Sequence, residues 1–109
     1  MATLATQTVA LGGLNPTYSA AAGGGDKVEC GDRNFLHIKN GSASSVTVTL
    51  TATAAVRGQS VTSPTVAVPA AGERLIGPLS PDLLQNSTDG LCAIGYSSAT
   101  TVTVASLRI

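Results

Sequence analysis

The sequence predicts an all-β fold, an antiparallel β-sandwich of about eight short strands arranged in a jelly-roll-like way. Apolar and polar residues alternate along short stretches, most clearly over residues 35–53. Gly, Pro, Asn and Asp separate these stretches at the spacing of turns. No segment has the period of a helical crossover, so a parallel α/β sheet is not expected. An immunoglobulin-like sandwich is the alternative.

The composition limits both the core and the surface. The 109 residues make about one small domain, with 43% hydrophobic residues but only 3% aromatic ones, so we expect a thin aliphatic core. Charged residues make up 11% and the net charge is zero, a surface that suits a protein in contact with others. No run of Lys or Arg supplies an attraction to nucleic acid or to an anionic membrane.

The single domain divides into an N-terminal strand or arm with a Gly-rich connection, residues 1–25, and a β-sandwich, residues 26–109. Residues 3–11 are expected to form a first strand with weak alternation. Residues 17–25 have no periodicity and end in three glycines, which favours a flexible connection. This arm is expected either to lie on its own sandwich or to reach a neighbouring subunit.

The sandwich itself begins with a predicted strand over residues 26–30, with Val28 pointing inward, and a turn over residues 31–34. Residues 35–53 then predict a β-hairpin whose reversal falls at residues 40–45. Its apolar face holds Leu36, Ile38, Val46, Val48 and Leu50.

The remaining segments are expected to be a loop over residues 54–63, strands over 65–68 and 73–76, one helical turn over 81–84, and a closing hairpin of residues 91–96 and 101–109. Pro69 cannot donate a hydrogen bond to a neighbouring strand, so it ends the strand before it. Ser80 is expected to cap the helical turn, with Pro81 at its first position.

Few residues are candidates for chemistry. His37 is the one histidine, and its neighbours in sequence offer no partner for acid–base catalysis, so a solvated or neighbour-facing role is favoured. Together with Cys30 and Cys92 it lacks the spacing of a zinc site. The acidic residues between 26 and 32 lack the spacing of a calcium loop, and the sequence has neither a P-loop nor a nucleophile elbow. We therefore expect no enzymatic activity, cofactor, metal or small-molecule substrate.

The sequence also bears on location. No stretch approaches the ~18 apolar residues of a membrane span. The N-terminal region lacks the charged start and continuous apolar segment of a secretion signal, so we expect a chain made and used without export. Cys30 and Cys92 are then expected to be reduced, although a disulfide between them stays open.

Several pieces of the chain together resemble one family. They are Gly25-Asp26-Lys27, FLHIKNG at 35–41, Val46-Thr47-Val48, PAAGERLIGP at 69–78, Asp89-Gly90, Tyr96-Ser97 and Val102-Thr103-Val104. In this order they resemble small virion proteins of tailed bacteriophages, and they are similar to capsid decoration (cement) proteins with β-sandwich folds. The resemblance covers most of the chain from Gly25 onward, and residues 69–78 are its most specific part.

The resemblance implies a non-enzymatic virion structural protein, made in the host bacterial cytoplasm, that binds the outer surface of an icosahedral head. Its partner is then the major capsid protein, it stabilises capsomer contacts, and it is a homo-oligomer with a trimer favoured. Expected contact residues lie in the arm and in two turns: Thr3, Leu4, Val9, Tyr18, Asp32, Arg33 and Arg57. The alternative is a carbohydrate-binding module of a phage tail or fibre, although the scarcity of aromatic residues weighs against it.

Overall fold

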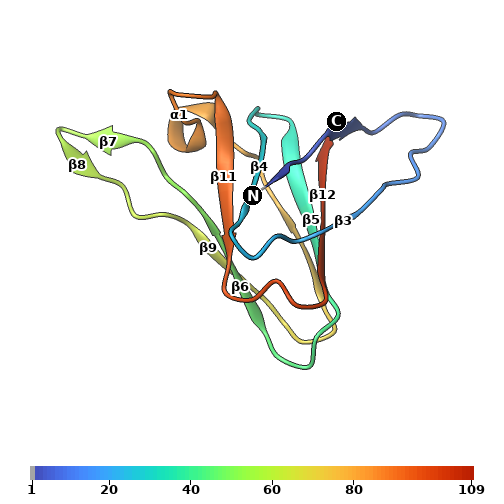
Figure 1. Cartoon of the computed structure of the whole chain (residues 1–109). Helices are drawn as coiled ribbons and strands as arrows, with labels where there is room; N and C mark the ends of the chain where they lie inside the picture. Colours follow the sequence, from blue (N-terminus) through green and yellow to red (C-terminus); the bar gives the residue numbers. More distant parts are fainter. Residues whose placement is uncertain (1) are drawn as a thin grey trace.

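The computed structural model describes residues 2–109. It consists of two packed β-sheets, a separate two-stranded ribbon and one short helix (Figure 1). In chain order the elements are β1 Ala2–Thr3, β2 Thr6–Thr8, β3 Ser19–Ala20, β4 Asp26–Glu29, β5 Asn34–Asn40, β6 Val46–Leu50, β7 Ala55–Val56, β8 Gln59–Ser60, β9 Thr65–Val68, β10 Glu73–Ile76, α1 Pro81–Leu84, β11 Leu91–Tyr96 and β12 Val102–Arg108. Sheet A has the order β1-β4-β11-β6-β9. Sheet B has the order β10-β5-β12-β2, with β3 also paired to β12.

Eight of these strands have the order of a jelly roll. If β3, β4, β5, β6, β9, β10, β11 and β12 are numbered one to eight, sheet A reads 2-7-4-5 and sheet B reads 6-3-8-1. All the pairs among them are antiparallel. In an immunoglobulin-like sandwich the last two strands lie side by side, whereas β11 and β12 lie in different sheets. The predicted antiparallel sandwich is confirmed, with jelly-roll rather than immunoglobulin-like order.

The core lies between the two sheets and is built by the alternation seen in the sequence. Every second residue of β5 and of β6 is buried, as predicted. The buried hydrophobic cluster comprises Leu4, Val28, Leu36, Ile38, Val46, Val48, Leu50, Val68, Ile76, Leu79, Leu84, Cys92, Ile94, Val102 and Val104. None of these side chains is aromatic, and all but that of Cys92 are aliphatic, so the core is aliphatic as the composition predicted.

Both predicted hairpins are wrong as strand pairs. β5 pairs with β10 and β12 in sheet B, whereas β6 pairs with β9 and β11 in sheet A. Likewise β11 lies in sheet A and β12 in sheet B. The connections at 41–45 and 97–101 therefore arch from one sheet to the other. The alternation of apolar and polar residues shows which face of a strand is apolar, but not which strand it pairs with. An arch lays the apolar faces of two strands against each other from opposite sheets, so it fits the same sequence pattern as a hairpin.

The N-terminal segment lies on its own sandwich, which is one of the two arrangements expected of the arm. The expected first strand is divided: β1 pairs in parallel with β4 of sheet A, β2 pairs in parallel with β12 of sheet B, and Leu4 is buried between them. The expected flexible connection contains β3, which pairs with β12. Residues 9–16 continue from β2 and project from the sandwich, and we call them the projecting loop (Figure 1). Met1, the first residue of the predicted arm, lies outside the described residues.

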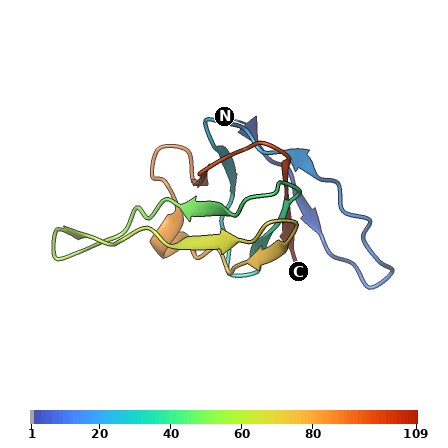
Figure 2. The ribbon, with the colours of Figure 1, turned by 90° about the horizontal axis from the view of Figure 1, so that it is seen from below.

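The segment expected to be a loop at residues 54–63 forms a two-stranded ribbon, β7–β8. Arg57 and Gly58 have φ values of 52° and 79° at its tip, as in the type I′ turn that matches the twist of a hairpin. The ribbon extends away from the sandwich on the side opposite the projecting loop (Figure 2).

The predicted helical turn is present as α1, with Pro81 at its start. Ser80 is the N-cap residue, as predicted, although its side chain makes no capping hydrogen bond. Over residues 2–109 the structure contains no helix with the length and hydropathy needed to cross a membrane.

Candidate interaction surfaces

The residues predicted to contact a partner are spread over the molecule. Thr3 lies on the edge strand of sheet A, Arg57 lies at the tip of the β7–β8 ribbon, and both are exposed. Val9, Asp32 and Arg33 are exposed near the end of β12, where Val9 N–H donates to the Arg108 carbonyl and Ile109 N–H donates to the Arg33 carbonyl.

The two other predicted contact residues lie elsewhere. Leu4 is only 8% exposed and belongs to the core of its own chain, so its side chain offers no surface to a partner. Tyr18 is half-buried and packs against sheet B. The structure therefore brings together only Val9, Asp32 and Arg33 of the predicted set.

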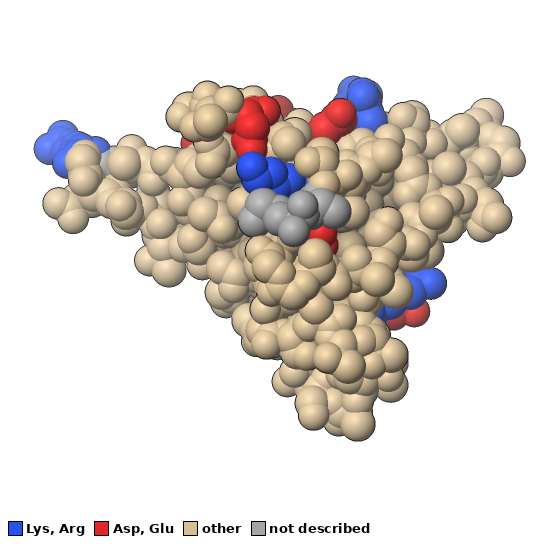
Figure 3. Space-filling view, viewed as in Figure 1, with Lys and Arg blue, Asp and Glu red and all other residues tan. Residues whose placement is uncertain are grey.

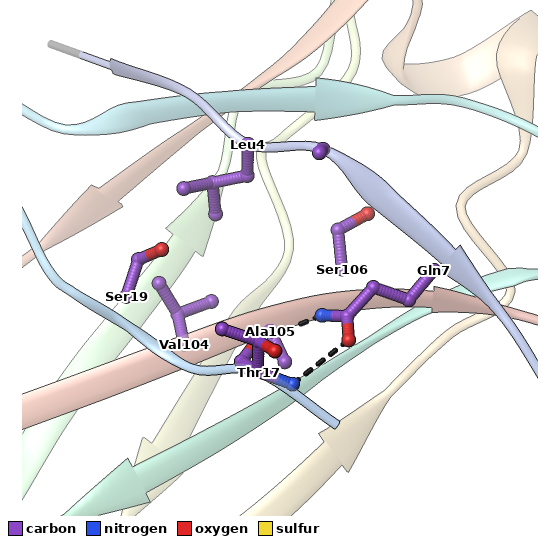
Figure 4. A pocket seen from close by; sticks show the side chains of 8 residues that line it. Leu4, Gln7, Thr17, Ser19, Val104, Ala105 and Ser106 are labelled. Atoms are coloured by element: carbon purple, nitrogen blue, oxygen red, sulfur yellow. Dashed lines mark hydrogen bonds between the residues drawn. The ribbon is translucent and has the colours of Figure 1, made fainter. Parts of the chain in front are cut away.

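The projecting loop is closed at its neck by one side chain. Gln7 Nε2 donates to the Thr17 carbonyl, and the Thr17 N–H donates to Gln7 Oε1, both at 2.8 Å (Figure 4). Beside this neck is a hollow of about 280 Å³, lined by Leu4, Ala5, Gln7, Thr17, Ser19, Val104, Ala105 and Ser106. None of these side chains is ionisable, so the hollow has no group for acid–base chemistry.

His37 acquires two partners that are distant in sequence. Its Nδ1 lies 2.6 Å from Tyr18 Oη, and its Nε2 lies 2.6 Å from Glu73 Oε1. A neutral ring that donates from Nε2 to Glu73 and accepts at Nδ1 from Tyr18 satisfies both contacts. Lys39 Nζ lies 4.1 Å from the centre of the Tyr18 ring. Both ring nitrogens are therefore engaged, and the network holds the segment around Tyr18 on β5 and β10.

Asp26 and Tyr96 form a second polar cluster, at the side of sheet A. The Asp26 carboxylate is fully buried, and its Oδ2 accepts from Tyr96 Oη at 2.8 Å and from the Ala22 N–H at 3.3 Å. Burial, together with the neighbouring carboxylate, raises the pKa of Tyr96 above its ordinary value. The phenol is thus a structural donor that ties β11 to β4.

Cys30 and Cys92 are free thiols. Burial raises the pKa of both, and that of Cys92 to about 12. Since the thiolate is the reactive form, both thiols are poor nucleophiles at neutral pH. Nowhere in residues 2–109 do three or more His, Cys, Asp or Glu side chains gather to hold a metal ion.

Charge is unevenly distributed over the surface. Most of the charged side chains visible in Figure 3 lie toward the broad end of the molecule. Lys27 forms an ion pair with Asp89, and this pair holds the pKa of the Asp89 carboxyl below its ordinary value. The connections at 41–45, 69–72 and 97–101 contain no charged residue. They meet at the opposite, narrow end, where the Ala71 N–H donates to the Ser42 carbonyl and the Gly41 N–H donates to the Thr101 carbonyl.

An apolar hollow of about 340 Å³ lies on the outer side of sheet B. It is lined by Asp32, Arg33, Asn34, Phe35, Leu75, Ile76, Gly77, Pro78 and Ile109, and we call it the Phe35 hollow. Sequence reasoning missed Leu75 as a surface residue, although β10 carried a signal. Leu75 and Ile76 are adjacent in a strand, so only one of them can face the core.

No family model, curated protein or solved structure matches this chain.

Proposed function

We propose that this chain is a non-enzymatic structural protein of a bacteriophage virion, a decoration protein that binds the outside of the head and stabilises contacts between capsomers. The motifs from Gly25 to Val104, and residues 69–78 above all, suggested this function. Jelly rolls recur among viral capsid domains, which supports the proposal by analogy. A fold alone does not define a function, so the geometry has to carry it.

The observation that carries the proposal is a thin body with two lateral extensions. The Cα atoms span 40 × 35 × 20 Å, and the β7–β8 ribbon and the projecting loop extend on opposite sides (Figures 1 and 2). A protein that clamps neighbouring subunits needs segments that reach beyond its own core. Many copies bound to one shell make weak individual contacts effective.

The surface chemistry supports the same function. The first 25 residues contain no charge, and the ribbon carries only Arg57 at its tip. Such segments can pack against another protein with little cost for removing charges from water.

A carbohydrate-binding module is less well supported. Sugar sites use an open aromatic face beside polar groups. Tyr18 has Lys39 over its ring and His37 at its edge, and Tyr96 donates to buried Asp26. Neither tyrosine ring has an open face on which a sugar could stack, so the carbohydrate-binding function loses its two best candidate residues.

Co-sedimentation tests the proposal. The purified protein is mixed with undecorated mature heads and with unexpanded proheads of the phage that encodes it. We expect saturable binding to heads, and weaker binding by a variant whose ribbon, residues 55–60, is replaced by an Asn-Gly turn. Heads already saturated with the protein are the control. If the protein binds neither the mature heads nor the proheads, the proposed function is refuted.

A further inference from the structure

Exposed apolar side chains are candidates for contact with another protein, because burying them removes apolar surface from water. Among residues whose side chains the structure describes, the exposed large hydrophobic residues are Val9, Leu11, Leu75 and Ile109. Two of them lie at the projecting loop and two line the Phe35 hollow. One surface is a protruding loop and the other is a depression.

The projecting loop presents Leu11 at its tip. The Gly13 N–H donates to the Ala10 carbonyl at 2.9 Å, and Gly13 has a φ of 98°, so a tight turn holds Leu11 outward. Leu11 is completely exposed. The hydrogen bonds of the Gln7 amide close the neck of the loop, and the loop has no charged residue. It can therefore enter an apolar site as a preformed unit, without removing a charge from water.

The Phe35 hollow is suited to receive it. Leu75 and Ile109 are 68% and 69% exposed, and Phe35 forms part of the lining. In the sheet register Leu75 lies opposite His37, and Phe35 opposite Leu107, on the face turned away from sheet A. β10 is also an edge strand. Asp32 and Arg33 line the rim with opposite charges, an apolar centre with a polar border.

We propose that the projecting loop of one copy docks into the Phe35 hollow of a second copy, with Leu11 inserted beside Leu75 and Ile109. One contact then covers Leu11, Leu75 and Ile109, which are the three most exposed of the four large hydrophobic residues named above. Because the net charge of the chain is zero, two copies do not repel each other electrostatically over long distances. The contact joins two different surfaces, so it is head-to-tail, and successive copies form a closed ring or an open chain.

This inference stands apart from the proposed function, since it concerns copies of the chain without a shell. A single loop buries less area than the roughly 1,200–2,000 Å² of a stable interface. We therefore expect dissociation constants of about 10 μM to 1 mM. The contact matters where copies are held close together.

Sedimentation equilibrium tests the association on the full chain. Wild type is expected to associate as its concentration rises toward about 1 mM, and Leu11→Asp and Leu75→Asp each to weaken the association constant about 10- to 100-fold. Thr62→Asp, on the exposed segment after β8, is the matched control and should associate as wild type does. Both altered leucines are exposed, so circular dichroism should show folded variants. A wild-type chain that stays monomeric throughout would overturn the proposal.

Disulfide trapping identifies the occupant of the hollow. Leu11→Cys and Leu75→Cys variants, distinguished by a small tag, are oxidised with copper phenanthroline separately and together. The proposal expects cross-linked dimers in the mixture and none above the wild-type background in either variant alone. A mixture of Thr62→Cys with Leu75→Cys controls for random collision. Leu11→Cys cross-linked to itself, or Leu75→Cys cross-linked to itself, would assign a different contact and overturn the proposal.

Discussion

Asn40 holds the narrow end of the sandwich together, and its removal tests how the sheets are joined. Its Nδ2 donates to the carbonyls of Ser44, Val68 and Pro69 at 2.8, 3.2 and 3.2 Å, and its Oδ1 accepts from Ser42 N–H at 3.0 Å and from Ser42 Oγ at 2.6 Å. The side chain is almost fully buried. One amide thus connects the arch after β5 to the turn after β9.

Asn40→Ala removes these five hydrogen bonds. Each is worth about 0.5–1.5 kcal/mol, and because such bonds share partners and are not additive we expect a loss of about 3 kcal/mol. A domain of this size is stable by about 5–15 kcal/mol, so the variant stays folded but its melting temperature falls by roughly 12 °C. Asn40→Asp keeps the acceptor for Ser42 but turns a second oxygen toward three carbonyls. It should therefore be less stable than Asn40→Ala at neutral pH.

Urea unfolding measures both variants. We expect a lower midpoint with an unchanged slope, which indicates lost stability rather than a changed unfolded state. Lower pH should narrow the gap between Asn40→Asp and Asn40→Ala, because a protonated carboxyl can donate. Asn86→Ala is the control, since the Asn86 side-chain oxygen accepts one hydrogen bond, from the Thr88 N–H at 2.8 Å, and the substitution should cost about 1 kcal/mol or less. An Asn40→Ala variant within about 1 kcal/mol of wild type, or an Asp variant more stable than the Ala variant at neutral pH, would refute the reasoning.

Three further predictions follow from buried groups and from the loop neck. Leu36→Ala should lower the free energy of unfolding by about 2–5 kcal/mol because Leu36 is fully buried, and urea unfolding that shows under 1 kcal/mol would contradict its place in the core. Burial raises the pKa of Cys92 from 9.0 to about 12, so between these values the native state keeps a proton that the unfolded state releases, and the free energy of unfolding falls as pH rises. Cys92→Ala should make this fall shallower when urea unfolding is measured at several pH values. An unchanged pH dependence would contradict the prediction. Gln7→Ala should speed deuterium exchange at the Thr17 amide at least about tenfold, and unchanged exchange would mean that the neck is held otherwise.

Much of the secondary structure could be predicted because its signals are local. The alternation of Leu36 and Ile38 with His37 and Lys39 follows from the two-residue period of a strand, whatever the strand pairs with. Pro69 ends β9 because it has no N–H to donate. The sequence predicts only a loop at Arg57-Gly58, although Gly is a residue that a tight hairpin turn favours, so part of the signal for the β7–β8 turn is present in the sequence.

The candidate surfaces were less predictable, since they depend on contacts between distant segments. His37 has no partner near it in sequence, and it meets Tyr18 and Glu73 only because β5, β10 and the segment before β3 share one face of sheet B. Leu4 was expected to contact a partner but fills the space between the sheets. No local pattern distinguishes an apolar residue that closes its own core from one that meets another molecule.

The sequence by itself determined the all-β class, the position of most strands and the buried face of β5 and β6, because these depend on residue type and on the spacing of neighbours along the chain. The tertiary structure decided which strands pair: β5 with β10 and β12 rather than with β6, and β11 with β4 and β6 rather than with β12. It also decided that Leu11 and Leu75 stay exposed. Strand partners and exposure are set by packing two sheets at once, and many pairings satisfy the same alternation until the whole core is closed.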